Sequence, residues 1–183
     1  MVASGLASAV TVREYLGSSY EPDCDYVDGH LEERNLGEFD HSRTQGLLYA
    51  WIFAHEQEWG VFALPEQRVQ VSPTRYRVPD VCLLRRDLPI EQIVRHAPVV
   101  CIEILSPEDS LKRVRERTAD YFAMGVENVW LLDPSTREGF VCTPVGMIQP
   151  PDGRLVVPGT AIFVPLAEIF AGLERALRAS RAG

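Results

Sequence analysis

Two apolar stretches, each interrupted by a single carboxylate, constrain the fold of this chain more than any other feature. Residues 76–84 carry Asp80 among Val, Cys and Leu, and residues 99–107 carry Glu103 among Val, Cys, Ile and Leu. Short runs of this kind predict strands buried in a sheet that is covered on both faces. A lone carboxylate in such a strand is costly to bury unless a partner compensates its charge. Two of them on successive strands can share one partner, and a divalent metal is the simplest choice.

The composition indicates one globular domain. With 183 residues, 46% of them hydrophobic, the chain is long enough for a substantial core. A formal charge of −8 excludes a protein that binds nucleic acid with its whole surface, although a local basic groove stays compatible with it. The four cysteines show no CxxC spacing, so we expect reduced thiols and no zinc site. No apolar run is long enough to span a bilayer and no basic leader begins the chain, so we expect a cytoplasmic protein without membrane contact.

Turn and capping signals divide the chain into helices and strands. Asp28-Gly29 predicts a hairpin within residues 26–35. Asp40 is a plausible N-cap for a helix from His41 to about residue 58, and Ser106-Pro107 predicts the start of a second helix that ends at Gly125. The remaining expected elements are short helices at 11–16 and 90–95, strands within 60–71 and at 128–133, small strands within 139–157, and a closing helix from 166 to about 179.

This order predicts a single α/β (α+β mixed) domain spanning residues 1–183, with a mixed central sheet flanked by helices. Its core covers about residues 15–143. Small peripheral strands and the C-terminal helix form an appendage of about residues 144–183.

The two carboxylates can meet if their strands are neighbours and the acids lie at matching height. Like charges at short range would otherwise raise one pKa, and a hard cation such as magnesium removes that conflict. For either residue alone we prefer a simpler interpretation, in which Asp80 caps the turn after Pro79 and Glu103 pairs with an arginine. For the pair in its context we prefer a metal site that orients a water at a phosphoryl group.

That context is an ordered set of motifs. They are Arg77-Val78-Pro79-Asp80-Val81, then residues 101–107, Glu116-Arg117 with Asp120-Tyr121, Gly125-Val126, and residues 129–134. Over roughly residues 15–143 this set resembles the Uma-type putative restriction endonuclease family, which belongs to the restriction-endonuclease-like PD-(D/E)xK superfamily. Upstream, residues 26–29 and His41 also resemble the N-terminal pattern of that family.

The resemblance implies a restriction-endonuclease-like core in which Asp80 and Glu103 bind magnesium, with manganese as the alternative. In the superfamily a lysine two residues after the Glu positions or activates the attacking water, but that position is Leu105 here. The resemblance implies a basic residue from the following helix instead, four positions before Tyr121, which is Arg117. Helical geometry also favours Arg117 over Lys112. Arg117 lies beside the row of buried apolar residues on that helix, whereas Lys112 points more toward solvent.

Two further residues complete the predicted site. His41 belongs to the predicted site only if the acidic pair is close to it in space, since a histidine in a first helical turn is more often a surface or capping residue. Gln67 precedes the strand that leads to Asp80 and could face the same site, and otherwise it is simply solvated. The simpler interpretation of Arg117 is a surface salt bridge with a neighbouring acid such as Glu116.

These features give two hypotheses of different kinds. The first is a metal-dependent DNA endonuclease that hydrolyses phosphodiester bonds, with Arg117 and His41 or Gln67 assisting Asp80 and Glu103. The second is a non-catalytic member of the fold that binds nucleic acid or another protein, favoured by Leu105 and the net charge. A homodimer is compatible with the first hypothesis.

Overall fold

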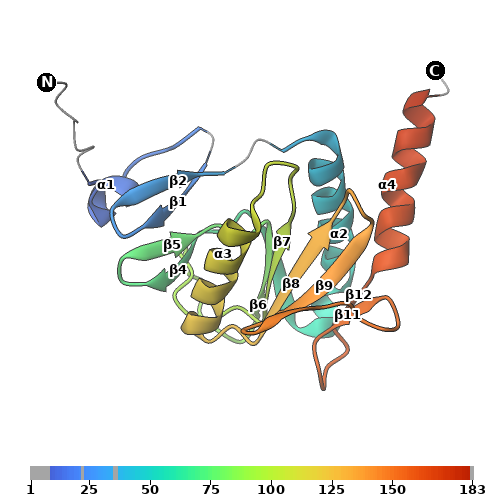
Figure 1. Cartoon of the computed structure of the whole chain (residues 1–183). Coiled ribbons are helices and arrows are strands. Elements are labelled where there is room, and N and C mark those ends of the chain that lie inside the picture. The colour runs from blue at the N-terminus through green and yellow to red at the C-terminus, as the bar shows by residue number, and fades with distance from the viewer. Residues whose placement is uncertain (1–8, 22, 35–36, 182–183) are drawn as a thin grey trace, which may run out of the picture.

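The structure is a computed structural model that describes residues 9–21, 23–34 and 37–181. A six-stranded sheet forms its centre (Figure 1), and its strand order is β10-β9-β8-β7-β6-β3. The strands are β3 (Val61–Pro65), β6 (Val81–Arg85), β7 (Val100–Ile104), β8 (Asn128–Asp133), β9 (Glu138–Thr143) and β10 (Gly146–Ile148). Strands β7 and β8 run parallel and the other neighbouring pairs antiparallel, so the predicted mixed sheet is confirmed.

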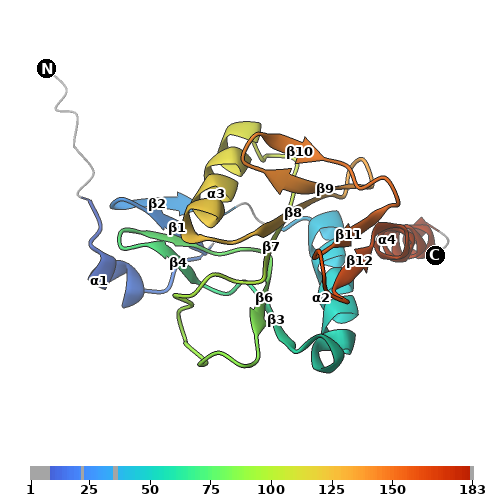
Figure 2. The same ribbon diagram turned by 90° about the horizontal axis from the view of Figure 1, so that it is seen from below.

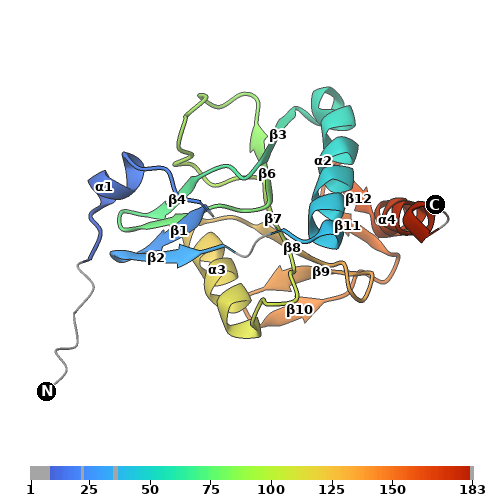
Figure 3. The ribbon, with the colours of Figure 1, turned by 90° about the horizontal axis from the view of Figure 1, so that it is seen from above.

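Helices cover both faces of this sheet (Figure 3). Helix α3 (Leu111–Met124) makes the crossover between the parallel strands β7 and β8, as such a connection requires. It buries Val114 and Tyr121 against one face, in a cluster that includes the free thiols of Cys82 and Cys101. The opposite face is covered by α2 (Phe39–Trp59) and α4 (Leu166–Arg181).

The C-terminal segment packs into the main core. Strands β11 (Arg154–Val156) and β12 (Phe163–Pro165) form a separate two-stranded sheet before α4. Leu155, Val164 and Leu173 of this segment are fully buried in the same cluster as the α2-facing side of the central sheet. The segment that we predicted as an appendage therefore supplies part of the largest hydrophobic cluster.

A second, four-stranded sheet lies beside α3 (Figure 2). Its order is β2-β1-β5-β4, formed by β1 (Cys24–Val27), β2 (His30–Glu33), β4 (Val69–Ser72) and β5 (Arg75–Arg77). The short helix α1 (Val12–Leu16) packs against it through Tyr15. The predicted hairpin is confirmed, with Asp28 at φ 49° and Gly29 at φ 93° in the turn between β1 and β2.

The stretch 76–84 is not one strand, contrary to our prediction. Strand β5 ends at Arg77 in the smaller sheet, and β6 begins at Val81 in the central sheet. Pro79 lacks an N–H and cannot continue a ladder, and the N–H of Val78 donates to Asp25 Oδ1 at 2.9 Å instead of to a strand. Asp80 therefore lies where the chain crosses between two sheets.

Three predicted helix positions are also wrong. Helix α3 begins at Leu111 with Ser110 as N-cap, because Ser106 and Asp109 bond each other in a tight turn that keeps the preceding residues out of the helix. Helix α2 has Glu38 at its N-cap in place of Asp40. Residues 90–95 form no helix, since Val94 pairs with Val69 in an isolated bridge. No helix in the described ranges is both long and apolar enough to cross a bilayer.

Candidate active site

The register of the central sheet brings the two predicted carboxylates together. Strands β6 and β7 pair antiparallel with Val81 opposite Ile102, so the register continued by one residue places Asp80 opposite Glu103. Both side chains are buried, with 2% of Asp80 and 1% of Glu103 exposed. The Asp80 carbonyl accepts hydrogen bonds from Glu66 N at 3.2 Å and from Gln45 Nε2 on α2 at 3.0 Å. These bonds hold the backbone of Asp80 in place at the sheet crossing.

The Asp80 carboxylate has a different partner on each oxygen. Oδ2 accepts a hydrogen bond from the Ile104 N–H at 2.7 Å and lies 3.5 Å from His41 Nε2. Oδ1 accepts a charged hydrogen bond from Arg34. Burial by itself raises the pKa of Asp80, but Arg34 and His41 outweigh it, so the pKa is lowered and the group is ionised at neutral pH.

The Glu103 carboxylate points toward α3. Tyr121 donates to its Oε1 at 2.5 Å, and Arg117 Nη1 lies 3.2 Å from its Oε2, which has no hydrogen-bond partner within the described ranges. Burial raises the pKa of Glu103 to about 7, with Arg117 opposing the shift and the charge of Asp80 adding to it. The two carboxyl groups therefore have pKa values displaced in opposite directions, a pattern typical of functional sites.

Arg117 bridges two acids and holds them in place. Its Nη2 donates to Asp109 Oδ1 at 2.8 Å while Nη1 faces Glu103. The simpler interpretation of a surface salt bridge does not describe this residue, because its side chain is only 12% exposed. Lys112, by contrast, is 83% exposed, as the helical periodicity predicted. Its Nζ lies 3.7 Å from Glu116 Oε1.

A small cavity lies directly against this ion-pair cluster. It has a volume of about 10 Å³, space for about one water-sized sphere, and Arg34, His41, Asp80, Asp109 and Arg117 line it together with Ile104 and Ser106. His41, Ser106 and Asp109 also line a groove of about 330 Å³ at the carboxyl ends of β7 and β8 and the start of α2. Ligands of α/β sheets commonly bind at such strand ends.

The donor set fits a magnesium ion better than a transition metal. The described residues contain no group of three or more His, Cys, Asp or Glu side chains placed to hold a metal. Magnesium needs no such cage, since one or two carboxylates commonly bind it together with waters and substrate phosphates. Asp80 and Glu103 supply two carboxylates, and Glu103 Oε2 is buried without a hydrogen-bond partner.

The structure does not bring Gln67 into this set. Its side-chain amide donates to the carbonyl oxygens of Arg68 at 3.1 Å and Gln92 at 2.9 Å, and Gln67 is not one of the residues that line the cavity. Gln45 of α2 is the glutamine that contacts Asp80. Leu105 is partly buried and packs against the α3-facing cluster, so the position two residues after Glu103 is apolar.

Three residues of the site escaped the sequence analysis. Arg34 follows a hairpin strand, Asp109 follows the predicted helix start at Ser106-Pro107, and Tyr121 was noted only as part of a motif and not as a site residue. Burial of a tyrosine by itself gives no signal of its hydroxyl partner. Arg34 lies 46 residues from Asp80 in the chain, so no local pattern could have joined them.

Comparisons with known proteins agree on one family. The family model described as Uma2: Putative restriction endonuclease matches residues 12–176. The crystal structure of a putative nuclease belonging to DUF820 from Anabaena variabilis ATCC 29413 is similar at a TM-score of 0.77 and 25% identity, covering 90% of this chain and 99% of that chain. A cryo-EM structure of a DrdV–DNA complex is too distant to support an argument, with a TM-score of 0.38, 16% identity, and coverage of 73% of this chain and 10% of that chain. No curated protein matches the sequence.

Proposed function

Since this chain belongs to the Uma2 family of putative restriction endonucleases, we propose that it is a nuclease that hydrolyses phosphodiester bonds of DNA with a magnesium ion held by Asp80 and Glu103. The observation that carries the proposal is the pairing of two buried carboxylates across β6 and β7, of which Asp80 lines a cavity that shares residues with a groove. Burial of two acids is costly for the fold, so a ligand that requires both is the physical reason we offer for the arrangement.

The surrounding side chains orient the two carboxylates. The Ile104 N–H and His41 hold Asp80 from one side, and Tyr121 with Arg117 holds Glu103 from the other. Arg117 thereby acts as a positioning residue, because its two terminal nitrogens face Glu103 and Asp109.

A bound magnesium ion would supply Lewis-acid stabilisation of the phosphoryl group and an ordered water near neutral pH. The chain contributes proton transfer through His41, whose Nδ1 is buried without a hydrogen-bond partner in the part of the chain that the structure describes. Burial lowers the pKa of His41, but the carboxylate of Asp80 outweighs it and the pKa is raised. Histidine is the side chain whose ordinary pKa lies nearest to neutral pH, which suits it to proton transfer. Arg117 cannot take this role because a guanidinium stays protonated.

Cleavage of supercoiled, linear and single-stranded DNA tests the proposal. We expect cleavage with Mg²⁺ or Mn²⁺ that EDTA and Asp80→Ala both abolish. Arg117→Met should lower the rate about 10- to 100-fold, the usual effect of disturbing a residue that orients a metal ligand. Lys112→Met is the matched control on the same helix, and its exposed side chain should leave the rate unchanged. Absence of cleavage with either metal on all three DNA forms would reject the proposal.

Two observations favour a second candidate, a non-catalytic module for nucleic acid or protein. Leu105 replaces the lysine of the superfamily, and the groove beside the cluster is lined by Glu38, Asp40, Asp109 and Asp133, whose charges repel phosphates. A Mg²⁺ titration of the protein alone separates the candidates. Metal binding that Asp80→Asn removes favours the nuclease, whereas no binding favours the module.

The dimer is a separate prediction. Nucleases of this fold that pair can cut two strands, and light scattering after gel filtration would measure the oligomeric state. A monomer at high concentration would contradict it.

A further inference from the structure

Arg34 covers the carboxylate that the proposed metal requires. It follows β2, its side chain is 13% exposed, and one terminal nitrogen pairs with Asp80 Oδ1. Its other terminal nitrogen, Nη1, is buried and has no hydrogen-bond partner among the described residues. A guanidinium commonly engages a carboxylate through two parallel hydrogen bonds, and Arg34 makes only one such bond to Asp80.

The two oxygens of Asp80 differ in how easily they can be released. Oδ2 is bonded to the N–H of Ile104 at 2.7 Å, so its position is tied to the backbone of β7. Oδ1 is bonded to a side chain, that of Arg34. Oδ2 also faces His41 Nε2 at 3.5 Å, whereas Oδ1 has a single side-chain partner among the described residues. A cation therefore reaches Oδ1 with the smaller rearrangement, and this is the oxygen that Arg34 covers.

Glu103 is arranged differently. Its Oε2 lies 3.2 Å from Arg117 without a hydrogen bond, while Arg117 is anchored to Asp109 at 2.8 Å. Glu103 can thus offer an oxygen to a cation while Arg117 keeps its anchor. Metal binding therefore requires a side chain to move at Asp80 and not at Glu103.

We infer that Arg34 is an internal counter-cation that competes with the divalent metal for Asp80 Oδ1 and leaves this oxygen when the metal binds. The inference rests on the proposed function, since it concerns the same site. The released guanidinium needs an acceptor, and the oxygens of a phosphodiester match its geometry. Nucleic acid and metal would then favour the same withdrawn position of Arg34, so each raises the affinity for the other.

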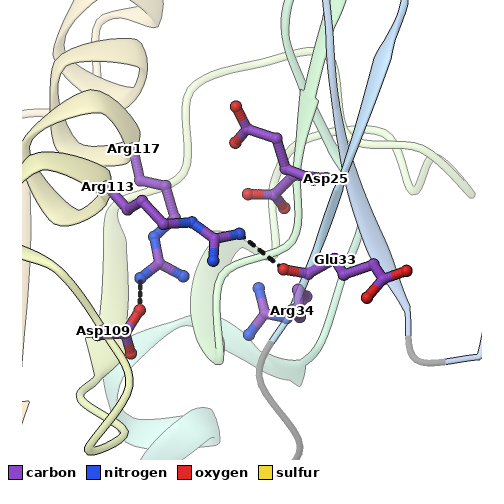
Figure 4. A pocket seen from close by; sticks show the side chains of 7 residues that line it. Asp25, Glu33, Arg34, Asp109, Arg113 and Arg117 are labelled. Carbon is purple, nitrogen blue, oxygen red and sulfur yellow. Dashed lines mark hydrogen bonds and ion pairs between the residues drawn. The ribbon is translucent and has the colours of Figure 1, made fainter. Parts of the chain in front are cut away.

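Manganese binding by the full chain without nucleic acid tests this inference, with free Mn²⁺ followed by electron paramagnetic resonance. Arg34→Met should bind Mn²⁺ at least about tenfold more tightly than wild type. The matched control is Arg113→Met. Arg113 lines a second small cavity together with Arg34 and Arg117 (Figure 4). It donates to the Glu33 carbonyl at 2.7 Å and not to Asp80, so its loss removes the same charge without uncovering Asp80. We expect a change of less than about threefold for this control.

Each outcome of the titration decides the inference. If wild type binds Mn²⁺ and Arg34→Met binds no more tightly than Arg113→Met, Arg34 does not compete and the inference is overturned, while metal-dependent cleavage stands. If neither wild type nor Arg34→Met binds, both proposals are overturned.

The gain in affinity also has to be located at the site. Adding Asp80→Asn to Arg34→Met should remove the gain, and a gain that persists would place the ion elsewhere and overturn the inference. Circular dichroism checks the fold of each variant. If Arg34→Met does not fold, Arg34→Gln replaces it, because the neutral amide can still donate to Asp80 and the same tenfold criterion applies.

Discussion

Replacing Glu103 by glutamine is expected to stabilise the metal-free fold at alkaline pH. Glu103 is 1% exposed, and burial, opposed by Arg117 and reinforced by Asp80, raises its pKa from 4.5 to about 7. The folded state therefore retains the proton at pH values where the unfolded chain has lost it. The stability from this group is fully present below the unfolded pKa and is lost as the pH rises through the folded pKa.

The size of the effect follows from the pKa difference. A shift from 4.5 to about 7 corresponds to about 3 kcal/mol at 1.36 kcal/mol per unit. Glutamine has nearly the same volume and stays neutral, and Arg117 keeps Asp109 as a partner at 2.8 Å. The difference in free energy of unfolding between Glu103→Gln and wild type should therefore grow by about 2–3 kcal/mol from about pH 5 to about pH 8.

Urea unfolding followed by tryptophan fluorescence measures this difference, in EDTA so that no metal pairs with the carboxylate. The control is Glu116→Gln, whose side chain is 48% exposed and lies 3.7 Å from Lys112. Its effect should stay within about 0.5 kcal/mol at both pH values. A Glu103→Gln effect on the free energy of unfolding that does not change with pH, or that is more favourable at about pH 5, would refute the conclusion that burial raises the pKa of Glu103.

Three other changes are expected to alter stability. Tyr121→Phe removes the donor to Glu103 Oε1 and should cost about 1.5–3 kcal/mol above pH 7 in the same urea assay, and a loss below about 0.5 kcal/mol would contradict the hydrogen bond. Arg77→Met removes a cation, itself 1% exposed, that pairs with Asp25, Glu32 and Asp120, of which Asp120 keeps Arg75 at 2.9 Å, and it should cost about 3–5 kcal/mol. The loss of the exposed pair in Arg85→Met should have a much smaller effect, so equal effects would argue against a buried network. Gly125→Ala should lower the stability by about 1–2 kcal/mol, read from thermal melting, because φ is 101° at the end of α3, and an unchanged melting temperature would contradict that conformation.

Local patterns in the sequence were sufficient for several elements. The turn at Asp28-Gly29 and the helix end at Gly125 were predicted because each depends on backbone conformations that neighbouring residues determine. The mixed sheet followed from the alternation of apolar runs and amphipathic helices, and the two carboxylates stood out because acids are rare in such runs. The same reasoning chose Arg117 over Lys112 from helical periodicity, and the structure places Arg117 beside Glu103.

Local patterns failed where a side-chain hydrogen bond or a crossing between sheets determined the path of the backbone. The strong helix-start pattern at Ser106-Pro107 was overridden by the turn that Asp109 closes, and the run containing Pro79 was divided between two sheets. Both failures lie next to the candidate site.

The sequence by itself determined which residues could form an acidic pair, whereas the tertiary structure decided what that pair contacts. Arg34 reaches Asp80 across 46 residues, and Tyr121 reaches Glu103 across 18, through the path of the chain between two sheets and over α3. Side-chain chemistry and backbone preference are properties of short segments and can be inferred from them. The meeting of charges depends on how those segments pack, because each buried charge requires a partner that only the folded chain can bring within hydrogen-bonding distance.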